Sequence, residues 1–223
     1  MNLNRLELLI GKENVERIKK LNILLVGIGG VGGYTFESLV RCGVENITII
    51  DYDRVDETNL NRQILTNLNN IGEFKTDIAE LRALSINSNI KVNKIINFLD
   101  SSNIDTIDFS KFDYVIDACD SIDTKVLLIN NCIYNKVKII SSMGTAKKMD
   151  ASKLEITSLD KTSYDPLAKI LRKKIDKKIQ RKVIVISSTE KPMDIKELGS
   201  NSYVPAVAGL FITNYIINDI SKY

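Results

Sequence analysis

A cluster of five glycines directly after a short apolar run constrains this chain more than any other feature. Residues 22–26 are mostly branched and apolar, residues 27–33 read Gly-Ile-Gly-Gly-Val-Gly-Gly, and the amphipathic stretch that follows ends at Gly43. That order predicts a strand, a tight turn and a helix. Such a turn lets backbone N–H groups approach a phosphate while the helix dipole favours its negative charge. We therefore predict that a nucleotide binds at Gly27, Gly29, Gly30 and Gly32, although glycines that serve only the turn are the alternative.

Strand-like and helical segments alternate along the first two thirds of the chain. Strands are predicted at residues 22–26, 46–50, 91–98, 114–118 and 138–143, and helices at 5–19, from about 72 onward, and at 123–134. This alternation predicts a parallel sheet with helices on both faces. The fold class is therefore α/β, a Rossmann-like and mostly parallel sheet flanked by helices.

The pattern loosens after residue 143 into an α+β C-terminal extension. Segments 154–159 and 182–188 are expected to be strands around a basic helix, and a last helix over 206–220 is expected to pack against the body. A chain of 223 residues fits a single large core. We predict one domain over 1–223, with an N-terminal helix at 1–20, a nucleotide-binding core at 21–145 and a substrate-binding C-terminal half at 146–223.

The chain contains no histidine, and this excludes several classes of chemistry. Ser-His-Asp triads, Cys-His pairs and His-ligated metal sites cannot form within it. Its three cysteines, Cys42, Cys119 and Cys132, are isolated in apolar contexts, which is typical of free thiols in a reducing compartment. No apolar run approaches the length of a membrane span. We expect a cytoplasmic protein with no membrane partner.

Charged residues after the second predicted strand favour ATP over NAD. Asp51 stands nineteen residues after Gly32, where a carboxylate can accept hydrogen bonds from ribose hydroxyls in either ligand. A triphosphate also needs cations beyond this acid, and Arg62 and Lys75 supply them. Taken singly, both could be solvated surface charges. The predicted nucleotide site also includes Asp53, Asn59 and Gln63.

Two acids close the fourth predicted strand. Asp117 and Asp120 are expected to project into the crevice at the carboxyl ends of the strands, and so to belong to the nucleotide site. Mg²⁺ prefers one or two carboxylates together with phosphate oxygens, and Asp120 is the predicted ligand. An N-cap role at the following helix is the competing interpretation of Asp120.

Together these motifs resemble those of the superfamily of enzymes that activate ubiquitin-type and sulfur-carrier proteins. The shared pattern is a glycine-rich turn, D-x-D at 51–53, N-x-N-R-Q at 59–63, a lysine at a helix start and D-x-x-D at 117–120. The resemblance implies a ThiF-type domain in which a substrate carboxylate attacks the α-phosphate of ATP. It also implies a homodimer, because an arginine from the N-terminal helix of a second subunit reaches the phosphates. Arg5 occupies that position.

The C-terminal half is similar to one branch of that superfamily, the tRNA threonylcarbamoyladenosine dehydratases. The segments that carry this likeness are 159–168, Arg172, 188–192 and 204–209, and the chain lacks the C-x-x-C pairs of most sulfur-carrier activators. The branch implies ATP-dependent cyclisation of threonylcarbamoyladenosine in tRNA through a carboxyl-adenylate, with a sulfur-relay protein as a further partner. Residues 144–152 depart from the expected G-x-x-D-P-T form.

Positive charge is concentrated between residues 169 and 182. This segment has eight basic residues and one acid, a balance of +7 in a chain of net charge +3, so the remainder carries −4. Such a concentration is typical of a nucleic-acid footprint, although a solvated helix face or a membrane-surface helix has the same composition. The residues predicted to bind tRNA are Lys169, Arg172, Lys173, Lys177 and Arg181.

These expectations define one reaction and its alternatives. ATP and Mg²⁺ are the predicted cofactors, and Arg5, Arg62, Lys75 and Asp120 are the predicted catalytic residues. The nearest alternative is an adenylyltransferase that activates the C-terminal Gly-Gly of a sulfur-carrier protein. An NAD-dependent reductase and a non-catalytic nucleotide- or tRNA-binding module are further alternatives.

Overall fold

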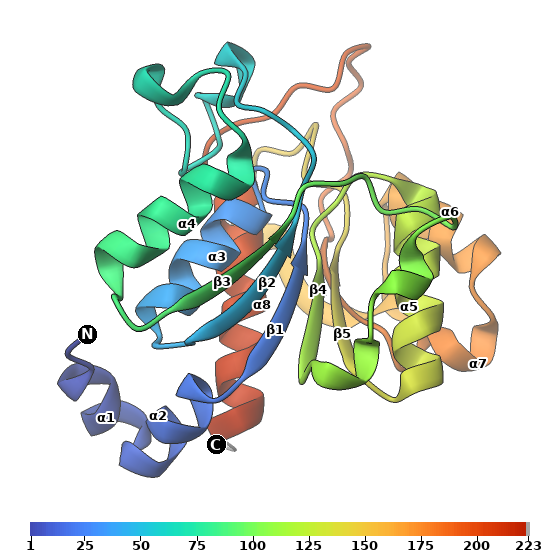
Figure 1. Ribbon diagram of the computed structural model, residues 1–223. Coiled ribbons are helices and arrows are strands. Elements are labelled where there is room, and N and C mark those ends of the chain that lie inside the picture. The colour runs from blue at the N-terminus through green and yellow to red at the C-terminus, as the bar shows by residue number, and fades with distance from the viewer. Residues whose placement is uncertain (222–223) are drawn as a thin grey trace.

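The computed structural model describes residues 1–221 and forms a single sheet with helices on both faces (Figure 1). Its helices are α1 (Asn4–Ile10), α2 (Lys12–Lys19), α3 (Gly32–Arg41), α4 (Lys75–Ile86), α5 (Ile122–Asn135), α6 (Pro166–Lys174), α7 (Lys177–Gln180) and α8 (Val204–Ser221). Its strands are β1 (Asn22–Val26), β2 (Asn46–Ile50), β3 (Lys91–Ile95), β4 (Tyr114–Asp117), β5 (Lys138–Ser142), β6 (Leu154–Ser158) and β7 (Ile184–Ser188).

The seven strands follow the order β3-β2-β1-β4-β5-β7-β6. All neighbouring pairs are parallel except β6 and β7, which run antiparallel at one edge. The predicted Rossmann-like, mostly parallel sheet is confirmed. β7 enters between β5 and β6, so the α+β C-terminal segment continues the same sheet.

Alternate side chains of each central strand enter two separate cores. In β1, Ile23 and Leu25 pack in a core with α3, α4 and α8, whereas Leu24 and Val26 pack in a core with α5 and α6. This follows from the two-residue period of a strand that is buried on both faces. The same alternation in β4 turns Val115 toward α5, and its next odd residue is Asp117.

Helix α8 returns to the first half of the chain and packs against α3. The Thr35 hydroxyl donates a hydrogen bond to the Gly209 carbonyl at 3.1 Å, which holds the two helices close together. The prediction that the last helix packs against the body is confirmed. Within residues 1–221, none of the helices combines the length and apolar composition that a bilayer crossing requires.

Two predicted helices are interrupted. The N-terminal helix ends at Ile10, because Gly11 takes a left-handed φ of 85°, and a second helix begins at Lys12. The basic helix ends at Lys174, because Ile175 is extended and the Asp176 carboxylate caps the short α7 by accepting from the Lys178 N–H. The expectation of one continuous helix was wrong at both places.

Candidate functional site: a nucleotide-sized cavity at the sheet edge

A cavity of about 1000 Å³ crosses the carboxyl ends of five parallel strands. Its walls include the segments that follow β3 (97–99), β2 (51–53), β1 (27–31), β4 (118–122) and β5 (142–146). Ligands of open α/β sheets bind in the crevice outside these strand ends. The volume is at the upper end of the range for small-molecule sites, so a nucleotide leaves space beside it.

The glycine turn between β1 and α3 forms one wall of the cavity through Gly27, Gly29 and Gly30. Gly27 has a φ of 88°, and a Cβ on it would lie 2.8 Å from the Ala118 carbonyl oxygen. Gly32 does not line the cavity. A Cβ on Gly32 would lie 1.9 Å from the Gly27 carbonyl oxygen, so this glycine allows the turn to close against the helix start.

Asp51 connects the end of β2 to the glycine turn. Its Oδ2 accepts from the Ile28 N–H at 2.7 Å, and its Oδ1 accepts from the Asp53 N–H at 2.8 Å. Burial raises the pKa of the Asp51 carboxyl, and this outweighs the two hydrogen bonds, which lower it. Each carboxylate oxygen has a second lone pair, so Asp51 can still accept from a ligand hydroxyl.

Two predicted cations lie on the same wall. Lys75, the first residue of α4, is only 6% exposed, and its Nζ lies 2.7 Å from Asp53 Oδ2. Arg62 is half-buried, and its guanidinium is oriented by hydrogen bonds that it donates to the Thr58 carbonyl at 2.8 Å and to Asn61 Oδ1 at 2.9 Å. Both residues line the cavity, so the structure brings together the acids and cations that were far apart in sequence.

Asn59 and Gln63 also line the cavity. Asn59 Oδ1 accepts from the Asp56 N–H at 3.2 Å and so completes a capping box that shapes the loop. Gln63 is buried, and its Oε1 has no hydrogen-bond partner within residues 1–221. A buried acceptor without a partner is unfavourable, and a ligand hydroxyl or amine would satisfy it.

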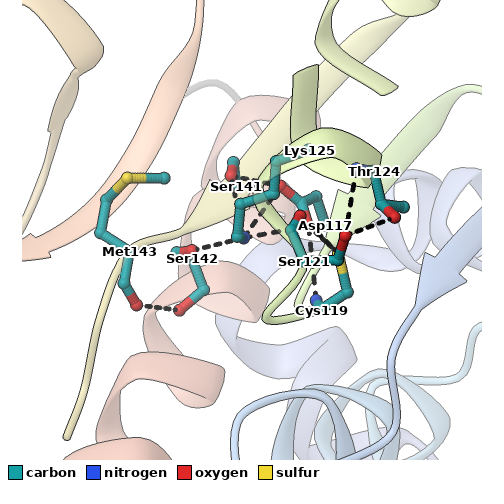
Figure 2. A network of polar contacts seen from close by, with 8 residues as sticks. All are labelled: Asp117, Cys119, Ser121, Thr124, Lys125, Ser141, Ser142 and Met143. Carbon is teal, nitrogen blue, oxygen red and sulfur yellow. Dashed lines mark hydrogen bonds and ion pairs between the residues drawn. The ribbon is translucent and has the colours of Figure 1, made fainter. Parts of the chain in front are cut away.

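Asp117 does not line the cavity. Its side chain is fully buried, and the Lys125 ammonium lies 3.0 Å from both of its carboxylate oxygens (Figure 2). Ser141 of β5 also donates to Asp117 Oδ2. The expectation that Asp117 projects into the crevice is therefore corrected: alternation along β4 turns it toward α5.

Lys125 was not singled out from the sequence, yet it supports two walls of the cavity. Its Nζ donates to the Ser142 carbonyl at 2.8 Å, and Asp117 Oδ1 accepts from the Cys119 N–H at 3.3 Å (Figure 2). The ion pair therefore fixes the turn after β4 relative to the end of β5. The sequence signal was weak, because a lysine in the first turns of a helix is usually solvated.

Asp120 is exposed at the cavity, on the turn between β4 and α5. It is not the helix cap, since Ser121 Oγ accepts from the Thr124 N–H at 3.3 Å and takes that role. Among the described residues, no group of three His, Cys, Asp or Glu side chains is arranged to hold a metal. One carboxylate beside a phosphate site fits Mg²⁺, which takes most of its ligands from phosphates and water.

Cys119 lines the cavity but is not an activated nucleophile. Burial, followed by the negative charge of Asp117, raises the pKa of the Cys119 thiol well above its usual range. Its Sγ donates to Asp117 Oδ1 at 3.1 Å. Because the thiolate is the reactive form of cysteine, this site does not favour a covalent thioester.

The remaining predicted residues lie outside the cavity. Arg5 is exposed on α1, at the end of the sheet opposite the cavity (Figure 1). Lys169 and Lys173 are exposed on α6, Lys177 is exposed on α7, and Arg181 is exposed directly after α7. Arg172 is partly buried, and its guanidinium donates to the Thr162 carbonyl at 2.9 Å, so it holds α6 to the preceding loop. The exposed basic surface therefore includes four of the five predicted residues.

Comparisons with known proteins agree with this architecture. A model of the ThiF family matches residues 2–222. The tRNA threonylcarbamoyladenosine dehydratase of Bacillus subtilis is 37% identical over 239 residues, which cover 98% of this chain and 94% of the relative. The Escherichia coli tRNA N6-threonylcarbamoyladenosine dehydratase has crystal structures with ATP and with AMP. The ATP complex superposes with a TM-score of 0.94 at 30% identity, and the match covers 99% of this chain and 93% of the Escherichia coli chain. The AMP complex superposes with a TM-score of 0.92 at 30% identity, and the match covers 98% and 93% of the two chains. Matches that span nearly the whole chain show that this protein belongs to the ThiF family.

Proposed function

We propose that this protein uses ATP to dehydrate threonylcarbamoyladenosine in tRNA. The observation that carries the proposal is the single cavity in which the glycine turn, Asp51, the Asp53–Lys75 pair and Arg62 meet. Relatives that match almost the full chain carry the name of this activity, and one of them was crystallised with ATP.

The cavity fits ATP in a defined direction. The Asp51 carboxylate would accept from the ribose hydroxyls, and the N–H groups of the glycine turn would face the phosphates. Arg62 and Lys75 would neutralise charge on the phosphates beyond the turn. The partner-free Gln63 Oε1 supports this fit, because ATP carries hydroxyl and amine donors.

The proposed reaction has two steps. A threonyl carboxylate oxygen attacks the α-phosphorus of ATP, an O–P bond forms, the bond to the β-phosphate breaks, and pyrophosphate leaves. The carbamoyl oxygen of the same nucleoside then attacks the activated carbonyl, a nitrogen releases its proton, and AMP leaves. The net change is loss of one water from the nucleoside. The second step is intramolecular, so it needs no protein nucleophile, which suits the protected thiol of Cys119.

Asp120 is the proposed ligand of Mg²⁺. When bound, the ion would neutralise phosphate charge and orient the leaving pyrophosphate. Arg5 is proposed to reach the cavity of a partner in a homodimer, as the resemblance implies, because α1 lies at the end of the sheet opposite the cavity of its own chain. Cytoplasmic location and a sulfur-relay partner complete the proposal.

The exposed residues Lys169, Lys173, Lys177 and Arg181 are proposed to contact tRNA phosphates. Helix α6 begins beside the cavity, where Leu167 and Ile170 form part of the wall, and leads away from it. An RNA whose modified nucleoside enters the cavity would therefore pass over this basic surface. Its binding should weaken steeply with salt, because each neutralised phosphate releases counterions.

Isotope exchange between pyrophosphate and ATP tests the first step separately from the second. We expect exchange that requires both Mg²⁺ and tRNA that carries threonylcarbamoyladenosine, because adenylate formation is reversible. An unmodified tRNA of the same sequence is the control. Exchange that instead requires a protein with a C-terminal Gly-Gly would assign the chain to sulfur-carrier activation.

A further inference from the structure

One part of the cavity wall differs in chemistry from the part that suits the nucleotide. The acids and cations of the wall follow β2 or β4, or lie in the loop before α4 and at the first residue of that helix. The other part consists of residues 142–146, the first turns of α6 and residues 198–200, and it meets the charged part where Asn61 Nδ2 donates to the Ser200 carbonyl at 3.3 Å. Within the described residues this part of the wall contains no charged side chain. It therefore suits an uncharged, largely apolar group.

Leu198 presents a large apolar surface in this uncharged part of the wall. It lines the cavity and is 81% exposed, in a loop that forms neither helix nor strand. The loop is nevertheless held in place by Lys147, whose N–H donates to the Gly199 carbonyl at 2.9 Å and whose carbonyl accepts from the Met193 N–H at 2.8 Å.

The Lys147 side chain adds further contacts to the same loop. Its ammonium donates to the carbonyls of Ile195 and Lys196. The Lys147 backbone has a φ of 61°, a conformation that lysine seldom takes. Lys147 therefore contacts the loop on both sides of Leu198. These contacts fix the position of this leucine.

Helix α6 supplies the second apolar surface and the charges beside it. Ile170 lines the cavity with Leu167 and is 39% exposed. Lys173 follows Ile170 by three residues and so lies on the same side of the helix. Lys169 directly precedes Ile170 in the sequence. Both lysines are exposed. An apolar surface flanked by ammonium groups matches an unstacked nucleotide, which offers an uncharged ring face beside a phosphate.

We propose that Leu167, Ile170 and Leu198 form the binding site for the nucleobase of the RNA substrate, while Lys169 and Lys173 contact its neighbouring phosphates. The inference rests on the proposed function and names the part of the cavity that recognises the RNA. The base must leave its stack to enter, as bases do in enzymes that act on them. Its acyl substituent then extends along the cavity toward the glycine turn.

Fluorescence anisotropy with the full-length protein tests the site independently of activity. The probes are a tRNA that carries threonylcarbamoyladenosine and an unmodified transcript of the same sequence. We expect the wild-type protein to prefer the modified tRNA and Leu198→Ala and Ile170→Ala to bind it about 5- to 10-fold more weakly, as removal of one base contact does. Leu198 is so exposed that its truncation leaves the fold intact, which an unchanged Kd for ATP verifies.

Salt titrations separate the two parts of the proposed site. The double variant Lys169→Gln, Lys173→Gln should reduce the slope of log Kd against log salt by about 1 to 2, whereas Leu198→Ala should leave the slope unchanged. Leu81→Ala is the matched control, because Leu81 is 64% exposed on α4 and does not line the cavity.

Binding of the modified tRNA within twofold of wild type by both Leu198→Ala and Ile170→Ala would overturn the inference. Loss of the preference in these variants, together with a wild-type protein that forms no cyclic nucleoside, would instead support the base site and reject the proposed reaction.

Discussion

The Lys125 ammonium lies 3.0 Å from both carboxylate oxygens of Asp117, and neither side chain is exposed to solvent. Lys125 also donates to the Ser142 carbonyl, so one buried charge connects β4, α5 and the end of β5. The pair lies directly behind the turn that carries Asp120, so it determines the position of that wall of the cavity.

Lys125→Met should destabilise the protein by about 3–5 kcal/mol, because it leaves the Asp117 carboxylate buried without its counter-ion. Urea unfolding measures this change. Lys174→Met is the control, since the Lys174–Asp123 pair has the same 3.0 Å separation at side chains that are 48% and 83% exposed. An exposed pair contributes under about 1 kcal/mol. Equal losses in the two variants would contradict a special role for the buried pair.

Arg62→Ala should lower kcat about 100-fold or more, which corresponds to about 3 kcal/mol of transition-state stabilisation. The reason is that the Arg62 guanidinium lies at the cavity and is oriented by the Thr58 carbonyl and by Asn61. Pyrophosphate release measures the rate. Arg17→Ala, at an exposed position on α2, should leave the rate unchanged. A near-normal rate for Arg62→Ala would remove this residue from the catalytic machinery.

Cys119→Ser should keep most of the wild-type rate. A serine hydroxyl can donate to Asp117 as the thiol does, and the raised pKa of Cys119 disfavours the thiolate, the form in which cysteine acts as a nucleophile. Single-turnover product formation measures the effect. A 100-fold loss of rate with unchanged thermal stability would indicate a thioester intermediate and would contradict direct cyclisation.

The affinity for adenosine should fall on acidification. The fall should begin at a higher pH than it would if Asp51 had the usual pKa of an aspartate. Burial raises the pKa of Asp51, and the carboxyl accepts ribose hydroxyls fully only when it is ionised. As pH falls through that raised pKa, one acceptor is lost, which weakens binding roughly fivefold, or about 1 kcal/mol. Calorimetry from neutral pH down to about pH 4, the usual range of an aspartate, follows this loss. Asp51→Asn should bind weakly and without the acid-dependent change, and an identical pH profile in the two proteins would be inconsistent with the assignment.

The first half of the fold could be predicted because its signals are local. Strand β1, the glycine turn and α3 are adjacent in sequence, and apolar periodicity and glycine spacing define them. The place of β7 between β5 and β6 could not be predicted in this way, because it depends on pairing between residues far apart in the chain. The break after α6 depends on an Asp176 cap that the lysine-rich composition concealed.

The sequence predicts which residue types form the site better than it predicts where their side chains point. Asp117 and Asp120 have the same chemistry and stand three residues apart, yet only Asp120 lines the cavity. The pleat of β4 makes that difference, and the end of a strand is hard to place from sequence. Lys75 and Lys125 both occupy the first turns of helices, and only the packing of each helix shows that one faces the cavity and the other an ion pair behind it.

The most direct measurement is nucleoside mass analysis after incubation of the protein with ATP, Mg²⁺ and tRNA that carries threonylcarbamoyladenosine. The account predicts that the modified nucleoside loses the mass of one water and that one AMP forms for each nucleoside converted. An unchanged nucleoside, with ATP consumed only when a protein ending in Gly-Gly is added, would contradict it.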